Sequence, residues 1–239
     1  TDYIAGESRD VLRQRAVERL GFSRNGRHVV MRSVVDGLEK HIDMYESEIL
    51  DIFKNVIGMI CIYRDVTRQL QIERRLTLRA NTDDLTELFN RHYFFRSIPA
   101  TLSAGAGLAY IDLDNFKHVN DKFGHHAGDK ALILTAQILR KHLRDAVIAR
   151  LGGDEFAAFF PESCSKALLR NCAEELLVAM DEAFDGHEAF AGLSASIGIT
   201  LAEQPGLARD DLVRQGDVAM YEAKRLGKRR YCVYSASLE

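Results

Sequence analysis

The sequence is poor in the residues that mark secreted or membrane-spanning proteins. It has no tryptophan, three prolines and four cysteines among 239 residues. The cysteines are Cys61, Cys164, Cys172 and Cys232. They form no Cys-x-x-Cys pair and lack zinc-site spacing, which favours reduced thiols over a disulfide framework. No apolar run approaches the roughly 20 residues of a membrane helix, and the polar first residues are unlike a signal peptide. We expect a cytoplasmic protein, or the cytoplasmic part of a longer one with membrane segments outside this sequence.

The sequence also lacks a large excess of charge of either sign. Its formal net charge is −3, with 46% hydrophobic and 28% charged residues. This balance provides no broad basic field for nucleic acid, so we expect no nucleic-acid partner. Any site for a phosphate group must be local. The apolar content is that of a globular chain with one or two cores.

The first 82 residues divide into two predicted parts. Residues 1–66 read as a small module, and residues 67–82 as a polar linker helix with Thr67 as its N-cap. That helix is either a rod paired with its copy in a dimer or a solvated spacer. The elements predicted within the module are a helix at Arg9–Leu20 and strands at His28–Val35, Ile42–Ile52 and Val56–Arg64.

Residues 83–239 alternate between strand and helix patterns, which predicts a mixed α+β or α/β domain with a central sheet flanked by helices. The paired glycines Gly152-Gly153 are typical of a β-hairpin turn. The predicted strands are Leu108–Leu113, Val147–Leu151, Glu155–Phe160, Leu193–Leu201 and Tyr231–Tyr234. The predicted helices are Asp129–Leu143, Ser165–Phe184 and Asp211–Leu226.

Two acidic motifs follow strand patterns. In LAYIDLDNFKHVND, an apolar strand runs into Asp112 and Asp114, where a carboxylate suits Mg²⁺ or instead caps the following helix. Asp154 and Glu155 directly follow the paired glycines. If Asp112 and Asp154 converge, they form a two-carboxylate metal site able to organise a triphosphate. A solvated acidic turn is the alternative for the second motif.

Other polar residues suit a nucleotide. Asn120 and Asp129 offer the donors and acceptors that match the edge of guanine, although Asp129 is also suited to be a helix N-cap. Lys224 and Lys228 belong to a basic cluster at a helix C-terminus, which is favoured by the helix dipole and also suits a triphosphate. Lys117 is placed to join them.

Taken together and in order, these motifs resemble the GGDEF family of diguanylate cyclases over residues 83–235. The matching stretches are Asp84–Arg91, IDLDNFKHVNDKFGHHAGDKAL, RLGGDEF, Ser196–Gly198 and Asp217–Lys224. The resemblance implies a nucleotidyl-cyclase or palm-like fold with the GGDEF hairpin on its sheet. It also implies condensation of two GTP into cyclic di-GMP.

The resemblance further implies roles for individual residues. It makes Asp154, Glu155 and Lys224 catalytic, with the choice of base between the two acids left open. The implied ligands of Mg²⁺, or of Mn²⁺, are Asp112, the Leu113 carbonyl, Asp154 and Glu155. The implied substrate-binding residues are Asn115, Phe116, Lys117, Asn120, Asp129, Gly152, Gly153 and Lys228.

One such domain holds one GTP, so the implied reaction needs a homodimer with two-fold symmetry. One alternative function is a GTP-binding regulatory module without turnover, acting on a partner or on a phosphodiesterase domain outside this sequence. A generic two-metal nucleotidyltransferase or nuclease is a third, disfavoured by the guanine-reading pair and the lack of a basic face.

Two further features bear on regulation. The stretch from Gly58 to Thr67 resembles the end of a PAS domain, so residues 1–66 are expected to be part of a PAS-like sensor, or only an aid to dimerisation. Many family members carry an Arg-x-x-Asp product-inhibition site, at whose positions this chain has Leu143 and Ala146. We expect no feedback through it. Arg229 replaces the Asn that is usual at the basic end of the domain, a change that keeps this end positively charged.

Overall fold

The computed structural model describes residues 27–35, 37–162 and 164–238. The chain forms two compact units, Thr1–Leu78 and Arg79–Glu239. In the described ranges, none of the helices is both long enough and apolar enough to span a bilayer.

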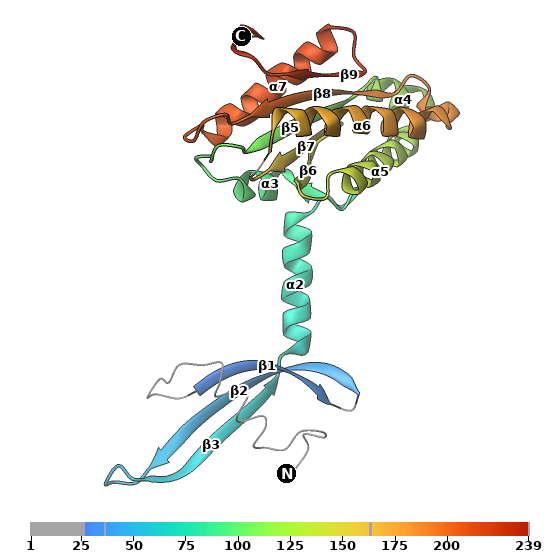
Figure 1. The fold of residues 1–239 in the computed structure, drawn as a ribbon. Coiled ribbons are helices and arrows are strands. Elements are labelled where there is room, and N and C mark those ends of the chain that lie inside the picture. Colours follow the sequence, from blue (N-terminus) through green and yellow to red (C-terminus); the bar gives the residue numbers. More distant parts are fainter. Residues whose placement is uncertain (1–26, 36, 163, 239) are drawn as a thin grey trace. The chain divides into compact units, whose positions relative to one another are not determined.

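The first unit contains a three-stranded antiparallel sheet of order β1-β2-β3 (Figure 1, blue to cyan). Its strands are β1 (Arg27–Val35), β2 (Leu38–Leu50) and β3 (Val56–Asp65). The three predicted strands are thus confirmed. The predicted helix at Arg9–Leu20 lies outside the described residues. The likeness to a PAS domain stays a prediction.

Helix α2 (Thr67–Asn81) follows β3 directly and has no buried residue, as expected of a polar linker. The Leu70 N–H donates to the Val66 carbonyl, so Val66 is the N-cap and the prediction of Thr67 for that position is wrong. Thr67 instead fixes the junction, because its hydroxyl accepts from the His41 N–H at 2.8 Å. Hydrogen bonds from Thr67, together with Lys40, lower the pKa of Asp65 to about 2.

The second unit contains a six-stranded sheet of order β4-β6-β7-β5-β8-β9 (Figure 1). The β4–β6 and β8–β9 pairs are parallel and the others antiparallel. The mixed sheet expected from the sequence is therefore confirmed. Its strands are β4 (Phe89–Asn90), β5 (Gly107–Asp114), β6 (Val147–Gly152), β7 (Glu155–Phe160), β8 (Ser194–Leu201) and β9 (Arg230–Val233).

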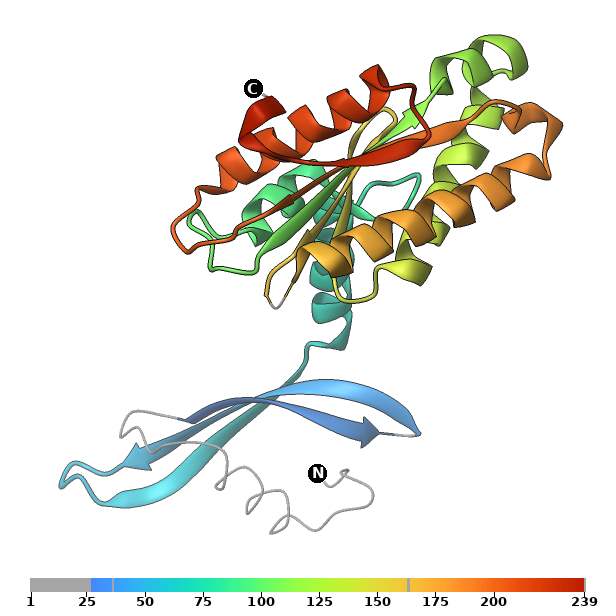
Figure 2. The same ribbon diagram turned by 45° about the horizontal axis from the view of Figure 1, so that its top comes forward.

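Helices cover both faces of this sheet (Figures 1 and 2). They are α3 (Arg91–Ser97), α4 (Phe116–Phe123), α5 (His125–His142), α6 (Lys166–Asp185) and α7 (Arg209–Arg225), with 3₁₀ turns η1 (Glu188–Phe190) and η2 (Ala236–Leu238). One apolar core joins α5 and α6 to the sheet, and a second joins α3 and α7 to the other face. The central strand β5 is buried along its whole length, because its side chains enter both cores.

Several short elements were not expected from the sequence. They are β4, α3 and α4, each of eight residues or fewer. Helix α5 also starts earlier than predicted, with Gly124 as its N-cap, so Asp129 lies inside the helix. The hypothesis that Asp129 caps this helix is wrong.

Two glycines let α7 approach the centre of the sheet. A Cβ at Gly198, in β8, would lie 2.0 Å from the Gly216 carbonyl oxygen and 2.3 Å from the Met220 nitrogen. A Cβ at Gly216, in α7, would lie 2.8 Å from Leu108. Because backbone cannot yield as a flexible side chain can, only glycine fits at Gly198. This contact sets the position of α7 and of the lysines at its end.

We predict that Gly198→Ala lowers the free energy of unfolding by about 2 kcal/mol or more, because the new methyl group forces α7 away from β8. Chemical denaturation of the purified variant measures the change. Gly186→Ala is the matched control, since φ is negative there and nothing lies within 4 Å of the added methyl. Equal effects of the two substitutions would contradict the packing argument.

Candidate functional site

The site is built around a buried carboxylate at the end of the central strand. Asp112 of β5 is 6% exposed and lies opposite Glu155 of β7 and Ser196 of β8. The Lys224 ammonium lies 2.7 Å from its Oδ1. Burial raises the pKa of Asp112 to about 6; Lys224 opposes the rise, and the charges of Asp154 and Asp114 add to it. A buried acid with one cation beside it and like charges nearby is typical of a functional site.

The hairpin of β6 and β7 brings the second acidic motif to this point. Gly152 pairs with Glu155, so Gly153 and Asp154 form the turn itself, one residue later than predicted. Gly152 and Gly153 have φ of 148° and 54°, which glycine adopts without steric cost. The Leu113 N–H donates to the Asp154 carbonyl at 3.2 Å and fixes the turn beside the end of β5. The Tyr110 hydroxyl donates to Glu155 at 3.3 Å.

Oxygen donors at the end of β5 suit a hard cation. Within the residues that the structure describes, no three His, Cys, Asp or Glu side chains are gathered as metal ligands. Asp112 and Asp154 are nevertheless close enough to repel each other electrostatically. Mg²⁺ takes one or two protein carboxylates and completes its shell with water and substrate phosphates. The donor set fits such an ion.

Arg150 holds the hairpin turn and was missed in the sequence. Its guanidinium donates to the Gly153 carbonyl from Nε at 3.0 Å and from Nη2 at 2.8 Å. Its Nη1 lies 3.2 Å from both carboxylate oxygens of Asp83. Burial raises the pKa of Asp83, but hydrogen bonds from Thr86 and the charge of Arg150 outweigh this effect and lower the pKa below its usual value. The turn that follows α2 is thereby joined to the turn that presents Asp154.

Asp114, for which the sequence suggests a metal ligand or a helix cap, caps no helix and is buried. It is 2% exposed and accepts from the Ser194 hydroxyl at 2.8 Å, the Ser196 hydroxyl at 2.7 Å and the Arg229 N–H at 3.1 Å. The N-cap of α4 is Asn115. Asp114 therefore joins β5, β8 and the segment after α7, and nothing in the local sequence indicated those partners.

Asn115 and Lys228 meet next to the carboxylates. Asn115 has φ of 63°, donates to the Gly192 carbonyl at 2.9 Å and accepts from the Lys228 ammonium at 2.8 Å. Phe116 and Lys117 are the first two residues of α4, and N–H groups at the start of a helix lack a partner one turn earlier. Free N–H groups beside lysine charge can hold phosphate oxygens. The structure thus places Asn115, Phe116 and Lys117 together, with Lys228 in contact.

The predicted guanine-reading residues lie on two helices in close contact. Asn120 is in α4 and Asp129 is in α5. A Cβ at Gly128 would lie 2.0 Å from the Asn120 Oδ1 and 3.1 Å from Phe116. The absence of a side chain at Gly128 therefore lets Asn120 pack against α5, next to Asp129.

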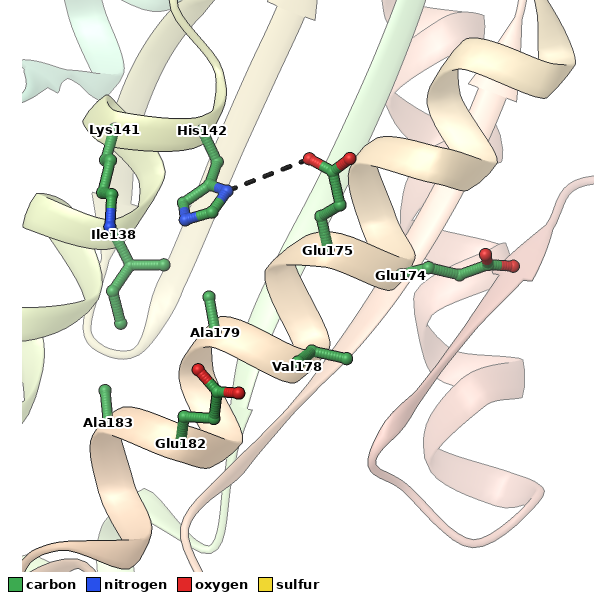
Figure 3. A pocket seen from close by; sticks show the side chains of 9 residues that line it. All are labelled: Ile138, Lys141, His142, Glu174, Glu175, Val178, Ala179, Glu182 and Ala183. Carbon is green, nitrogen blue, oxygen red and sulfur yellow. Dashed lines mark ion pairs between the residues drawn. The ribbon is translucent and has the colours of Figure 1, made fainter.

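A hollow of about 670 Å³ lies elsewhere, between α5 and α6 (Figure 3). His142 and Glu175 face each other across it, 3.9 Å apart. Its lining contains none of the residues predicted to bind substrate or metal. The candidate site lies instead at the end of β5, the hairpin and the end of α7, where Gly152 and Gly153 are exposed.

Comparison with known proteins bears on this site. A family model described as "Diguanylate cyclase, GGDEF domain" matches residues 80–230. "Probable diguanylate cyclase DgcE" of Escherichia coli is 35% identical over 189 residues, which are 74% of this chain and 17% of that protein. "Cyclic di-GMP phosphodiesterase PdeR" of the same organism is 35% identical over 190 residues, 77% of this chain and 29% of that protein. The chain thus spans under a third of the length of these two relatives.

A solved structure shares the fold. The coiled coil and GGDEF domain of DgcB from Caulobacter crescentus, in complex with c-di-GMP, superimposes with a TM-score of 0.62 at 26% identity. The match covers 70% of this chain and 93% of that one. The six-stranded sheet with its covering helices is therefore a known architecture.

We predict that Gly128→Ala weakens GTP binding about tenfold or more while the fold is retained, because the new methyl group displaces the Asn120 amide and needs only a small shift of the Phe116 ring. Isothermal titration with GTP and Mg²⁺ measures the affinity. Asn120→Ala should have a similar effect, and adding Gly128→Ala to it should change little. If Gly128→Ala bound GTP with wild-type affinity, Asn120 would not contribute to the binding of guanine.

Proposed function

Because the chain belongs to the GGDEF family of diguanylate cyclases, we propose that it condenses two GTP molecules into cyclic di-GMP and releases two pyrophosphates. The observation that carries the proposal is the contact of Lys224 with the buried Asp112, beside the turn that presents Asp154. A lysine and clustered carboxylates at one strand end are the parts that phosphoryl transfer requires.

In this proposal each GTP lies along the surface described above. Asn120 and Asp129 bind the edge of guanine. The triphosphate is held by the backbone of Asn115 and Phe116, by Lys117, Lys224 and Lys228, and by the open turn at Gly152 and Gly153. That turn is accessible, since nothing lies within 4 Å of a Cβ built at either glycine.

The chemical step joins the two nucleotides. The 3′-oxygen of one GTP forms a bond to the α-phosphorus of the other, the bond to pyrophosphate breaks, and the 3′-OH proton passes to Asp154 or Glu155. The same transfer in the opposite direction, with the acids of the second copy, closes the ring and releases the second pyrophosphate. Mg²⁺, or Mn²⁺, held by Asp112, the Leu113 carbonyl, Asp154 and Glu155, would neutralise phosphate charge. Lys224 adds positive charge where the transition state gains negative charge.

Two copies of the chain are needed, since each supplies a site for one GTP. The two sites face each other across a two-fold axis, and anything that orients the copies regulates the rate. We propose that residues 1–66 are a partial PAS-like sensor and that residues 67–82 transmit its state to the catalytic domain, residues 83–239. The polar, unburied α2 supports a connecting role. We place the reaction in the cytoplasm, because GTP is available there.

Feedback by the product through an Arg-x-x-Asp site is absent in this proposal. Leu143 occupies the position of the arginine in such a site. It is uncharged, 2% exposed and part of the core, so it cannot bind the product there. Arg144 and Asp145 are exposed in the loop before β6, adjacent in sequence and not three residues apart.

A second candidate is a GTP-binding module that regulates a partner. One similar protein is named as a phosphodiesterase, and the chain spans only 29% of it. The active enzyme is favoured, because Lys224 contacts Asp112 and Asp154 lies close enough to act on it electrostatically.

We expect the purified chain to form cyclic di-GMP from GTP and Mg²⁺ and Asp154→Ala to lose at least about 100-fold of that activity, because the variant removes a carboxylate from the reacting centre. Chromatography of the nucleotides measures the product. Asp145→Ala, which removes an exposed carboxylate from the loop before β6, should keep wild-type turnover. Near-normal turnover in Asp154→Ala would remove Asp154 from the site, and GTP binding without product would favour the regulatory module.

A further inference from the structure

The segment that follows α7 has an unusual backbone. Gly227, Lys228 and Arg229 have φ of 116°, 63° and 49° in succession. Glycine adopts such angles freely, but lysine and arginine do so only at an energetic cost. Since two adjacent residues with side chains are held there, their surroundings must supply contacts that maintain the conformation.

The start of the segment is fixed by the end of the helix. The Lys228 N–H donates to the Ala223 carbonyl at 3.0 Å, and the Gly227 N–H donates to the Lys224 carbonyl at 3.3 Å. These two bonds form a Schellman motif, in which the left-handed residue is the glycine. The motif explains the backbone of Gly227 and leaves that of Arg229 to other contacts.

Arg229 is held from two other elements. Its N–H donates to Asp114, as described above, and its Nε donates to the Asp181 carboxylate in α6 at 2.8 Å. This contact with Asp181 raises the pKa of Arg229, and the charge of Asp185 contributes less. The Asp181 side chain is 26% exposed and that of Arg229 is 56% exposed. The pair therefore ties the strained segment to a helix on the opposite face of the sheet from α7.

Arg229 directly follows a residue of the expected phosphate site. Lys228 contacts Asn115 through its ammonium group, at the entrance to α4 where phosphate is expected. A change of φ at Arg229 would redirect the chain beside Lys228 and break that contact. Asp181 thus acts on Lys228 through Arg229, without touching the substrate-binding surface itself.

We propose that Asp181 is a positioning residue for the triphosphate: by holding Arg229 in the left-handed conformation, it keeps Lys228 at Asn115 and sets the KM for GTP. The proposal rests on the GTP-condensing function proposed above. The contact lies outside the reacting centre, so it affects binding and leaves the chemical step unchanged.

A double-mutant cycle tests this. Asp181→Asn should raise the KM for GTP about two- to fivefold, the size expected of a partly exposed ion pair, with kcat within about twofold. In the Arg229→Asn background the same substitution should have almost no effect on KM, since asparagine adopts left-handed backbone more readily than arginine and needs no partner.

Asp185→Asn is the matched control, because it removes a charge near Arg229 without a direct contact, and its KM should stay near that of the wild type. An unchanged KM in Asp181→Asn, or an equal rise in both backgrounds, would overturn the role of Asp181. Thermal denaturation of each variant identifies a general loss of folding. Such a loss would lower kcat and the active fraction, and its effect would be the same with arginine or asparagine at position 229.

The outcomes also separate this proposal from the proposed function. A wild-type chain that forms product but shows no effect of Asp181→Asn overturns only the positioning role. A wild-type chain that binds GTP without forming product contradicts the enzyme, and the same cycle is then scored on the dissociation constant of GTP with Mg²⁺. A wild-type chain that does not bind GTP overturns both.

Discussion

The contact between Lys224 and Asp112 connects every part of the candidate site. Asp112 is buried at the end of the central strand, where a lone carboxylate would be costly. The cation that compensates it comes from α7, and α7 reaches that point only because Gly198 and Gly216 let the helix lie directly on the sheet. The fold thus places a lysine and a carboxylate together where a phosphate and its metal ion would need them.

Three other contacts fix the positions of the residues around this pair. Arg150 fixes the turn that carries Asp154, Asp114 fixes the segment after α7, and Gly128 allows Asn120 to lie beside α5. The contact of Asp114 with Arg229 spans 115 residues, whereas the other two are local, and each acts on a residue that we propose takes part in GTP binding or turnover.

Much of the domain could be predicted from the sequence, because its strands are apolar runs and its longer helices are amphipathic. The acidic motifs and the lysines were found for the same reason, as polar residues at the ends of such elements. The contacts that position them could not be found, since Arg150 and Asp83 are 67 residues apart and Ser194 and Asp114 are 80 apart. Short elements such as α4, and the cap at Gly124, carry too little periodicity to be read without their neighbours. The left-handed backbone at Arg229 could not be predicted from the residue itself, since arginine seldom adopts it.

The central claim is that two copies of this chain together convert GTP into cyclic di-GMP. The most direct measurement is the rate of cyclic di-GMP formation per chain over a wide range of chain concentrations, at saturating GTP and Mg²⁺. The account predicts that this rate rises with concentration and then reaches a plateau, because two sites have to meet. Cyclic di-GMP formed at a rate per chain that stays constant down to concentrations where the protein is monomeric by light scattering, or no cyclic di-GMP at any concentration, would contradict it.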